Sequence, residues 1–248
     1  MSIPRTALIT GGLGCLGTAI AQALHDAGHA VLLTHSPGRQ DVKAWLDGHA
    51  QAGYRYAAYP VDVADYDSCA ACADRIHGDG RQVDILINNA GITRDSTLRK
   101  LSRVDWDIVM RTNLDSMFNM TKPFCEGMVE RGWGRIVNIS SVNGSKGAFG
   151  QSNYSAAKSG IYGFTKSLAL EVARKGVTVN AVSPGYLDSA MVAKVPKDVL
   201  ESQIISQIPV GRLGQPSEIA ALVAFICSEP AAFMTGANLA MNGGQHMY

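Results

Sequence analysis

The chain has 248 residues, of which 46% are hydrophobic and 17% are charged, and its formal net charge is +1. A chain of this length and composition can bury a sizeable core within one α/β domain. The near-neutral balance argues against a broadly basic nucleic-acid binder and against an acidic disordered chain. No stretch approaches the roughly 20 apolar residues of a membrane-spanning helix, and the first residues lack the layout of a signal peptide. We therefore expect a cytoplasmic protein with no nucleic-acid or membrane partner.

Short apolar runs alternate with longer segments of helical periodicity along the whole chain. The runs are mostly continuous stretches of Val, Ile, Leu and Ala, which is typical of parallel strands covered on both faces. We predict strands at 7–10, 31–35, 56–63, 85–89, 135–140, 178–183 and 238–242. We predict helices at about 15–27, 41–52, 66–77, 103–131, 152–175 and 216–228. This alternation predicts an α/β fold: a Rossmann-like, doubly wound parallel sheet of about seven strands with helices on both faces.

No linker, low-complexity tract or change of composition divides the chain, so we expect a single domain over residues 1–248. One segment departs from the alternation of strands and helices. Residues 186–215 carry Pro196, Pro209 and Gly211, which interrupt regular elements. We predict that this segment forms a small helical flap over the carboxyl-terminal edge of the sheet.

The cysteines and histidines do not predict a metal site. An odd number of cysteines, five in this chain, is typical of reduced thiols in a protein too large to need disulfides. Cys69 and Cys72 form a C-x-x-C motif, but no second Cys or His pair completes a zinc site. Two small buried side chains on an alanine-rich helix are the favoured interpretation over metal or redox chemistry.

The first predicted strand ends in a glycine-rich turn at residues 10–17, with the sequence TGGLGCLG, and a helix is predicted to follow. Glycines at such a junction let backbone N–H groups approach a phosphate, and the helix N-terminus supplies partial positive charge. The turn therefore predicts a site for the pyrophosphate of a dinucleotide. The alternative is a glycine turn that binds no ligand.

The end of the second predicted strand indicates which dinucleotide binds. In NAD-binding proteins an acidic residue at this point contacts the ribose 2′-hydroxyl, but here no carboxylate occurs before Asp41. Ser36 and Arg39 are instead suited to receive a 2′-phosphate, which favours NADP. Asp62 and Val63 end the third strand, where they are expected to meet the adenine, although an Asp at this position is often only a helix cap.

Ser141, Tyr154 and Lys158 form the most informative group of residues. Tyr154 and Lys158 are four residues apart in a predicted helix, so both side chains point from one face. A neighbouring ammonium stabilises a phenolate, so Lys158 is expected to lower the pKa of Tyr154 towards the range of efficient proton transfer. Ser141 follows the fifth predicted strand and is placed to polarise a substrate carbonyl. The spacing alone is common among surface residues, but its combination with the glycine turn favours catalysis.

With these motifs in place, the chain resembles the short-chain dehydrogenase/reductase family over essentially its whole length. The matching elements are the turn at 10–17, Asn88–Gly91, Asn113, Ser141, Tyr154, Lys158 and Ser183–Gly185. The resemblance implies that Tyr154 protonates the carbonyl oxygen as hydride arrives from the nicotinamide. It also implies that Lys158 contacts the nicotinamide ribose and that Ser141 holds the substrate oxygen. Asn113 is implied to anchor the water chain that resupplies the proton.

The same resemblance implies a set of NADP(H)-binding positions. These positions are Gly11, Leu13, Gly14, Leu16, Ser36, Arg39, Asp62, Val63, Asn89, Ala90, Gly91, Tyr154, Lys158, Pro184 and Gly185. Cys15 stands where the family's usual turn has a glycine, which indicates a local change in the turn. Asn113 is also notable without the resemblance, because an amide in an apolar helical series is costly to bury without partners.

Within the family, the chain looks most like the acetoacetyl-CoA reductases of polyhydroxybutyrate synthesis, on residues 88–95, 132–144 and 242–247. This implies NADPH-dependent reduction of acetoacetyl-CoA to (R)-3-hydroxybutyryl-CoA by a homotetramer. The implied substrate-binding positions are Asp95, Lys100, Ser141, Phe149, Gln151, Tyr154 and Tyr186. Basic residues around Lys100 are suited to the phosphates of CoA or to an acidic carrier protein, although a solvated basic helix start is equally compatible.

Two alternatives remain open at this stage. One keeps the chemistry but changes the substrate to a 3-oxoacyl thioester of an acyl carrier protein or to another small ketone. The other is a scaffold that senses NADP without catalysis. The presence of Ser141, Tyr154 and Lys158 argues against the scaffold, because a sensor has no need of an acid–base tyrosine.

Overall fold

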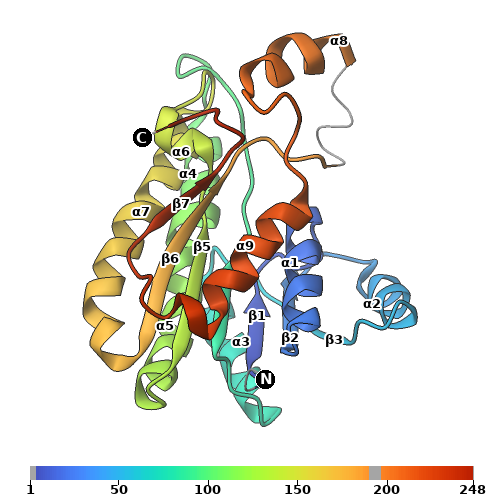
Figure 1. Cartoon of the computed structure of the whole chain (residues 1–248), viewed down its shortest axis with the longest axis vertical. Helices are drawn as coiled ribbons and strands as arrows, with labels where there is room; N and C mark the ends of the chain where they lie inside the picture. Colours follow the sequence, from blue (N-terminus) through green and yellow to red (C-terminus); the bar gives the residue numbers. More distant parts are fainter. Residues whose placement is uncertain (1–3, 190–196, 248) are drawn as a thin grey trace.

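A computed structural model describes residues 4–189 and 197–247. In this part of the chain, parallel strands form one sheet in the order β3-β2-β1-β4-β5-β6-β7, with helices on both faces (Figure 1). The strands are β1 (Thr6–Ile9), β2 (Ala30–His35), β3 (Tyr56–Pro60), β4 (Ile85–Asn88), β5 (Gly134–Ile139), β6 (Val177–Pro184) and β7 (Asn238–Met241). The prediction of a doubly wound, Rossmann-like parallel sheet is confirmed.

The helices lie close to their predicted positions. They are α1 (Cys15–Asp26), α2 (Val42–Gln51), α3 (Tyr66–Gly78), α4 (Arg103–Met110), α5 (Ser116–Glu130), α6 (Val142–Lys146), α7 (Ser152–Val172), α8 (Lys197–Val199) and α9 (Pro216–Cys227). The predicted helix 103–131 is interrupted by a π-helical turn, η1 (Arg111–Asp115), and α6 was not predicted. Within the described residues, no helix is both long and apolar enough to cross a membrane.

Two hydrophobic layers enclose the sheet because successive residues of a strand point to opposite faces. Leu8 of β1 packs in one layer with side chains from α3 and α5, such as Met120. Its neighbour Ile9 packs in the other layer with side chains from α1 and α9, such as Ile20 and Val223. Both faces of the central strands are therefore buried, which explains why these strands are apolar without alternation.

Buried polar side chains join the central strands to the helices that carry the candidate site. The Asn88 side-chain amide donates to Thr121 Oγ1 on α5, at 3.1 Å, and to Asn138 Oδ1 on β5, at 2.8 Å. The Asn138 side-chain amide in turn donates to Thr165 Oγ1 on α7, at 2.9 Å. Because these amides are buried, their hydrogen bonds hold α5 and α7 in register with the strand ends.

The predicted flap leaves the sheet after β6 and returns before α9. Residues 190–196, including Pro196, lie outside the described residues. At its base the N–H of Gly214 donates to the carbonyl of Tyr186, and the N–H of Asp188 donates to the carbonyl of Gly214. The described part of the excursion contains α8 and short helical turns at Leu200–Ile204 and Ile205–Gln207, which lie above the sheet in Figure 1.

The glycines of the turn between β1 and α1 pack closely against one another, which allows a test. A Cβ at Gly17 would lie 2.5 Å from the carbonyl oxygen of Gly11 and 2.8 Å from the Cα of Gly12, whereas a Cβ at Gly14 would meet only the Gly11 oxygen, at 3.3 Å. We expect Gly17→Ala to lower the free energy of unfolding by about 2 kcal/mol, and the matched Gly14→Ala to lower it by less than about 1 kcal/mol. Urea unfolding measures both values. Equal losses would contradict this account of the turn.

Candidate active site

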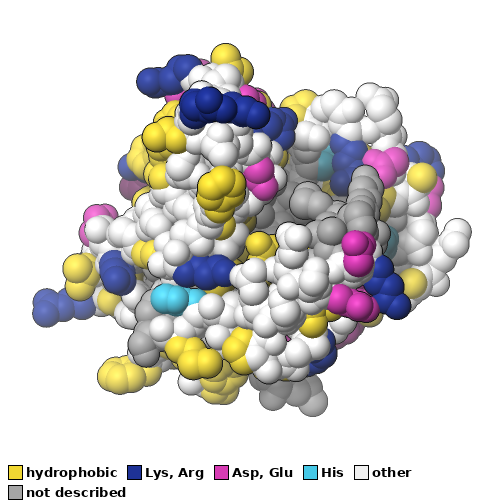
Figure 2. All heavy atoms as spheres, turned by 90° about the horizontal axis from the view of Figure 1, so that it is seen from above, with side chains coloured by type: hydrophobic (Ala, Val, Ile, Leu, Met, Phe, Trp, Pro, Cys, Tyr) yellow, Lys and Arg dark blue, Asp and Glu magenta, His cyan; other side chains and the backbone are white. Residues whose placement is uncertain are grey.

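Two connected cavities lie at the carboxyl ends of the strands. The larger, of about 770 Å³, and the smaller, of about 540 Å³, share Cys15, Leu16, Asn89, Gly91 and Ile92 on their walls. β1 lies between β2 and β4, so the chain crosses in opposite directions on its two sides at this point, and ligands of doubly wound sheets bind in the resulting crevice. Figure 2 views the molecule from this end, where the surface is hollowed near the centre.

The glycine turn presents an open helix N-terminus to the larger cavity. Gly14 is the N-cap of α1, and no side chain makes a capping hydrogen bond there. Gly11 has φ +61°, a conformation that favours glycine, and it accepts a hydrogen bond from the N–H of Gly14 at 3.1 Å. An uncapped N-terminus beside a backbone without side chains fits a pyrophosphate group.

Cys15 lies at the junction of the two cavities. Its Sγ is 3.8 Å from the carbonyl oxygen of Asp188 in the flap, which links the glycine turn to the flap through a weak hydrogen bond. Burial, with a smaller contribution from Asp188, raises the pKa of the Cys15 thiol. A raised pKa makes this thiol less reactive than a free cysteine.

All the positions predicted to bind the coenzyme line one of the two cavities. The turn and the ends of β2, β3 and β4 line the larger cavity, whereas Tyr154, Lys158, Pro184 and Gly185 line the smaller one. Thr10 Oγ1 accepts the N–H groups of Asn89 and Ala90, both at 2.9 Å, and so fixes the end of β4 beside the turn. The residues present fit a dinucleotide laid across the shared wall.

At the far end of the larger cavity, Arg39 is bound by Asp41, a hydrogen-bond partner that the sequence does not reveal. The Arg39 guanidinium donates to both carboxylate oxygens of Asp41, at 2.6 and 3.0 Å, and to the carbonyl of Leu13, at 3.2 Å.

Asp62 is not the cap of α3, because that position belongs to Asp65, whose side chain accepts from the N–H of Ser68. Asp62 accepts from Ala64 instead and lines the cavity.

Ser141, Tyr154 and Lys158 meet on the wall of the smaller cavity. Ser141 follows β5 and caps α6, where its Oγ accepts from the N–H of Asn143 at 3.2 Å, and its side chain is also hydrogen-bonded to Tyr154. Lys158 lies one turn beyond Tyr154 on α7, with Nζ 5.7 Å from the centroid of the phenol ring. Its ammonium donates to the carbonyl of Ile139 at 2.7 Å.

Burial dominates the electrostatics of this pair. Burial raises the pKa of Tyr154, the hydrogen bond from Ser141 acts in the opposite direction, and the Asp95 carboxylate adds to the rise. Burial also lowers the pKa of Lys158 to about 8. The sequence predicts the opposite direction for Tyr154. In the protein alone the phenol is desolvated, and the ammonium donates to a backbone carbonyl, so the loss of solvation prevails.

Asn113 is completely buried in the π-helical turn between α4 and α5. Its Nδ2 donates to the carbonyl of Ile92 and its Oδ1 accepts the N–H of Ile92, both at 2.8 Å. The amide therefore has the partners that its burial requires, and it fixes the loop after β4. A single π-helical turn inside a longer helix is frequent at functional sites.

The predicted substrate positions divide into two groups. Asp95, Gln151 and Tyr186 line the smaller cavity with Ser141 and Tyr154. Lys100 and Phe149 are not on its wall; both are exposed, with Phe149 94% accessible to solvent. The structure therefore does not bring these two together with the other positions.

Asn143, which lines the cavity and is buried, was not predicted as a site residue from the sequence. Its Nδ2 donates to Gln151 Oε1 at 2.9 Å. The one available signal was a polar residue two positions after Ser141, but α6 is too short to show a periodic pattern. Burial of the residue depends on segments that are distant in the sequence.

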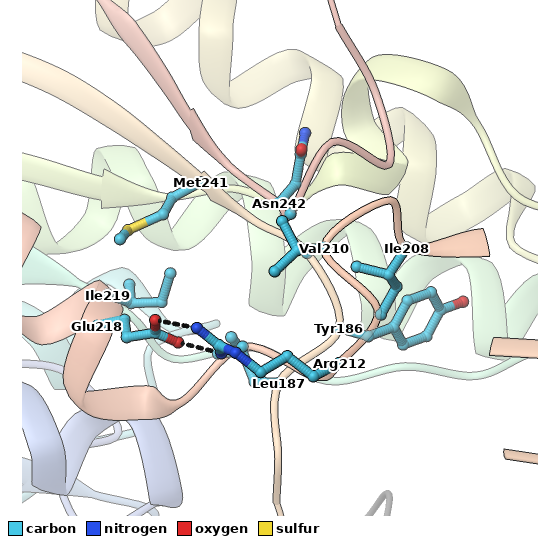
Figure 3. Close-up of a pocket in the computed structure, with 12 residues that line it drawn as sticks. Tyr186, Leu187, Ile208, Val210, Arg212, Glu218, Ile219, Met241 and Asn242 are labelled. Carbon is cyan, nitrogen blue, oxygen red and sulfur yellow. Dashed lines mark hydrogen bonds and ion pairs between the residues drawn. The ribbon is translucent and has the colours of Figure 1, made fainter. Parts of the chain in front are cut away.

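A third cavity, of about 200 Å³, lies behind the flap's base and shares Gly185, Tyr186 and Leu187 with the catalytic cavity. Figure 3 shows the ion pair that closes one side of it, in which Arg212 donates to both carboxylate oxygens of Glu218 at 2.8 and 2.7 Å. This pair ties the returning end of the flap to α9.

In the described part of the chain the five cysteines are free thiols, and no three His, Cys, Asp or Glu residues group as metal ligands.

Comparison with known proteins agrees with this fold and site. Residues 13–246 match the family model described as enoyl-(acyl carrier protein) reductase. The chain is 52% identical over 243 residues to the acetoacetyl-CoA reductase of Cupriavidus necator, covering 98% of each chain. It is 48% identical over 240 residues to nodulation protein G of Azospirillum brasilense, covering 97% of each. It is also 41% identical over 245 residues to the 3-oxoacyl-(acyl-carrier-protein) reductase FabG of Vibrio cholerae, covering 98% of each.

The fold and the paired cavities define a dinucleotide-dependent oxidoreductase. The chain belongs to the short-chain dehydrogenase/reductase family, as the sequence resemblance predicted. Enzymes of this family interconvert a carbonyl and a CH–OH group with a nicotinamide coenzyme, and this chain is a ketoreductase of that kind.

Because burial of the Lys158 ammonium is unfavourable, we expect the protein to unfold less readily when an apolar side chain replaces it. A pKa that falls from 10.5 to about 8 on folding corresponds to roughly 3 kcal/mol, and loss of the hydrogen bond to Ile139 costs about 1 kcal/mol. We expect Lys158→Met to raise the free energy of unfolding by about 1–2 kcal/mol at pH 7, measured by urea unfolding without coenzyme.

The pH dependence of Lys158→Met provides the control. Between pH 8 and 10.5 the unfolded wild-type chain still binds a proton that the folded protein has released. The free energy of unfolding of the wild type therefore rises over this window relative to the variant. A wild type whose free energy of unfolding does not rise relative to that of the variant between pH 8 and 10.5 would refute a desolvated ammonium.

Proposed function

We propose that this protein reduces the 3-keto group of acetoacetyl-CoA to (R)-3-hydroxybutyryl-CoA with NADPH. The observation that carries the proposal is the meeting of Ser141, Tyr154 and Lys158 on a cavity wall that opens into the dinucleotide cleft. The identity of 52% to a protein named acetoacetyl-CoA reductase supports the choice of substrate. A cytoplasmic location is part of the same proposal.

Ser141 and Tyr154 act on the keto oxygen. The bound coenzyme supplies a hydride to the carbonyl carbon. Ser141 Oγ accepts the N–H of Asn143, and its own proton, which is hydrogen-bonded to Tyr154 in the protein alone, turns to the keto oxygen when the substrate binds. The raised pKa of Tyr154 keeps the phenol protonated at neutral pH, so it is ready to give its proton to the developing alkoxide.

Lys158 and Asn113 complete the proton path. With a pKa of about 8, the Lys158 ammonium is mostly charged at pH 7, and it stabilises the phenolate that forms as Tyr154 releases its proton. One N–H is committed to the carbonyl of Ile139, which leaves two for the nicotinamide ribose and a water. Asn113 fixes the loop beside Lys158 and anchors the water chain that returns the proton.

Recognition of the substrate is divided between the cavity and the surface. Asp95, Gln151 and Tyr186 contact the acyl end inside the cavity. Phe149 and Lys100 are exposed and serve the CoA portion, which is too large for the cavity. Within the described chain neither Lys100 nor its neighbour Arg99 forms an ion pair, so both are available to phosphates.

Ser36 and Arg39 support NADPH as the coenzyme. Both line the larger cavity after β2, and no carboxylate stands where NAD-binding folds place one. Asp41 accepts from Nε and Nη2 of the guanidinium and Leu13 accepts from Nη1, which leaves one N–H on each terminal nitrogen for a 2′-phosphate.

A homotetramer is also part of the proposal. Val104, Phe118 and Leu170 expose apolar side chains on α4, α5 and α7, the helices whose sequences carry more apolar surface than one sheet face requires. Packing of these faces against further copies would bury that surface. Sedimentation analysis of the purified protein measures the assembly directly.

A second candidate substrate is a 3-oxoacyl thioester of an acyl carrier protein, favoured by the 41% identity to a reductase named for that activity. Oxidation of NADPH and of NADH should be followed with acetoacetyl-CoA, acetoacetyl-carrier-protein and simple ketones. We expect NADPH with acetoacetyl-CoA to give a kcat/KM at least about 10-fold above every other pair. A higher kcat/KM with acetoacetyl-carrier-protein than with acetoacetyl-CoA would contradict the CoA thioester as the substrate and favour the carrier-protein thioester.

Replacement of Tyr154 tests its role as the proton donor. Tyr154→Phe removes the hydroxyl but retains the ring, so we expect kcat to fall by at least about 10³-fold while NADPH still binds. Coenzyme fluorescence measures that binding and shows that the variant is folded. Retention of more than a tenth of the wild-type kcat would contradict the assignment, and would also reopen the possibility of a coenzyme-binding scaffold without this chemistry.

A further inference from the structure

Three polar side chains form a hydrogen-bonded row on the wall of the catalytic cavity. Asn143 Nδ2 donates to Gln151 Oε1 at 2.9 Å, and Gln151 Nε2 donates to Asp95 Oδ2 at 2.8 Å. All three line the cavity with Ser141 and Tyr154. The Gln151 amide accepts at one end and donates at the other, so it has one orientation, in which only its N–H₂ end faces the carboxylate.

The backbone around this row is also fixed. The N–H of Ser96 donates to the carbonyl of Gly150 at 2.8 Å, and Asn153 Nδ2 donates to the carbonyl of Arg94 at 3.0 Å. These two bonds lie on either side of Asp95 and join its loop to the start of α7. The carboxylate is therefore held in place by both its backbone and its side chain.

The Asp95 carboxylate is exposed to solvent and faces the cavity without an ion-pair partner among the described residues. Among the described residues it forms no ion pair, because its neighbour Arg94 lies 3.9 Å from Asp105 instead. Lys158 is the one Lys or Arg among the described residues lining the cavity, and its ammonium donates to the carbonyl of Ile139. Asp95 and Tyr154 line the same cavity, and the Asp95 carboxylate adds to the rise in the pKa of Tyr154 that burial causes.

We propose that Asp95, held by Gln151 and Asn143, selects neutral 3-oxoacyl esters and thioesters and rejects free 3-oxo acids. This inference rests on the proposed function. In a 3-oxo acid the carboxylate is two bonds from the keto carbon, so binding of the keto group at Ser141 and Tyr154 brings both negative charges into one cavity. A thioester has no charge at that position, and the charges of CoA lie far along its chain.

The size of the effect is limited by the exposure of Asp95 to solvent. Two carboxylates in one cavity, partly screened by protein and water, repel enough to lower kcat/KM by about 10- to 100-fold. The reductase would therefore act on activated acyl groups and leave free 3-oxo acids untouched. Asn143 and Gln151 are positioning residues in this scheme.

The test compares ethyl acetoacetate with lithium acetoacetate, two small probes that differ in the charge of the carboxyl end and in the ethyl group of the ester. For the wild type we expect kcat/KM to be at least 10-fold higher for the ester. Asp95→Asn preserves the shape and still accepts from Gln151, so we expect it to lower the ester-to-acid ratio of kcat/KM at least 10-fold, mainly through a higher value for acetoacetate. Asp105→Asn removes a carboxylate outside the cavity and should leave the ratio of kcat/KM for the ester to kcat/KM for acetoacetate as it is in the wild type.

A positioning role for Asn143 is tested with the same two probes. Asn143→Leu removes the hydrogen bond to Gln151 while keeping the same number and branching of side-chain heavy atoms, so we expect the ester-to-acid ratio to fall, mainly through KM for acetoacetate. Asn143→Gln, which can again donate to Gln151, should recover part of the ratio. An unchanged ratio in Asn143→Leu would remove Asn143 from the scheme.

The outcomes separate this inference from the proposed function. If the wild type reduces ethyl acetoacetate and acetoacetate equally well, or Asp95→Asn leaves acetoacetate as poor a substrate as before, charge selection by Asp95 is wrong while the reductase assignment stands. If the wild type reduces neither acetoacetyl-CoA nor the ester with either coenzyme, the proposed function itself fails.

Discussion

Burial of the Lys158 ammonium beside the Tyr154 phenol is the constraint on which the rest of the structure depends. Taking a charged group out of water is unfavourable, and here it is held by a single backbone acceptor, the carbonyl of Ile139. That carbonyl is available because β5 ends beyond the last residue of β4 with which it pairs. The two apolar layers and the side-chain hydrogen bonds of Asn88 and Asn138 hold the strand ends and α7 in place, so the ammonium stays at this carbonyl.

The same constraint explains how one cavity performs acid–base chemistry at neutral pH. Desolvation moves the two groups in opposite directions, raising the pKa of Tyr154 and lowering that of Lys158. The phenol therefore begins as an acid, and the ammonium is the nearest charge able to stabilise its conjugate base. Ser141 is oriented by the backbone of α6, and Asp95 by Gln151, so polar groups surround the keto group on more than one side.

The strands and the long helices were predictable from the sequence because the strands are continuous apolar runs and the helices have a regular period, whereas the short helix α6 and the π-helical turn η1 were not. The glycine turn and the Tyr154–Lys158 spacing also placed most of the site. Pairings between distant or competing side chains were not predictable. Arg39 is bound by Asp41, Asn143 is buried against Gln151, and Phe149 points into solvent, because burial and partner choice are set by the tertiary packing. The direction of the pKa of Tyr154 was wrong for the same reason: the sequence shows a neighbouring charge but not the loss of solvent.

Titration of the Tyr154 hydroxyl tests the central claim most directly. The protein labelled with carbon-13 at the tyrosine ring carbon that bears oxygen gives one NMR signal for each of its eight tyrosines, and the signal lost in the Tyr154→Phe spectrum identifies the site. In the absence of coenzyme, the account predicts a pKa above the ordinary value of about 10 for this hydroxyl. A pKa at or below 10 would show that the phenol is solvated or already paired with a cation, and would contradict the desolvated pair described above.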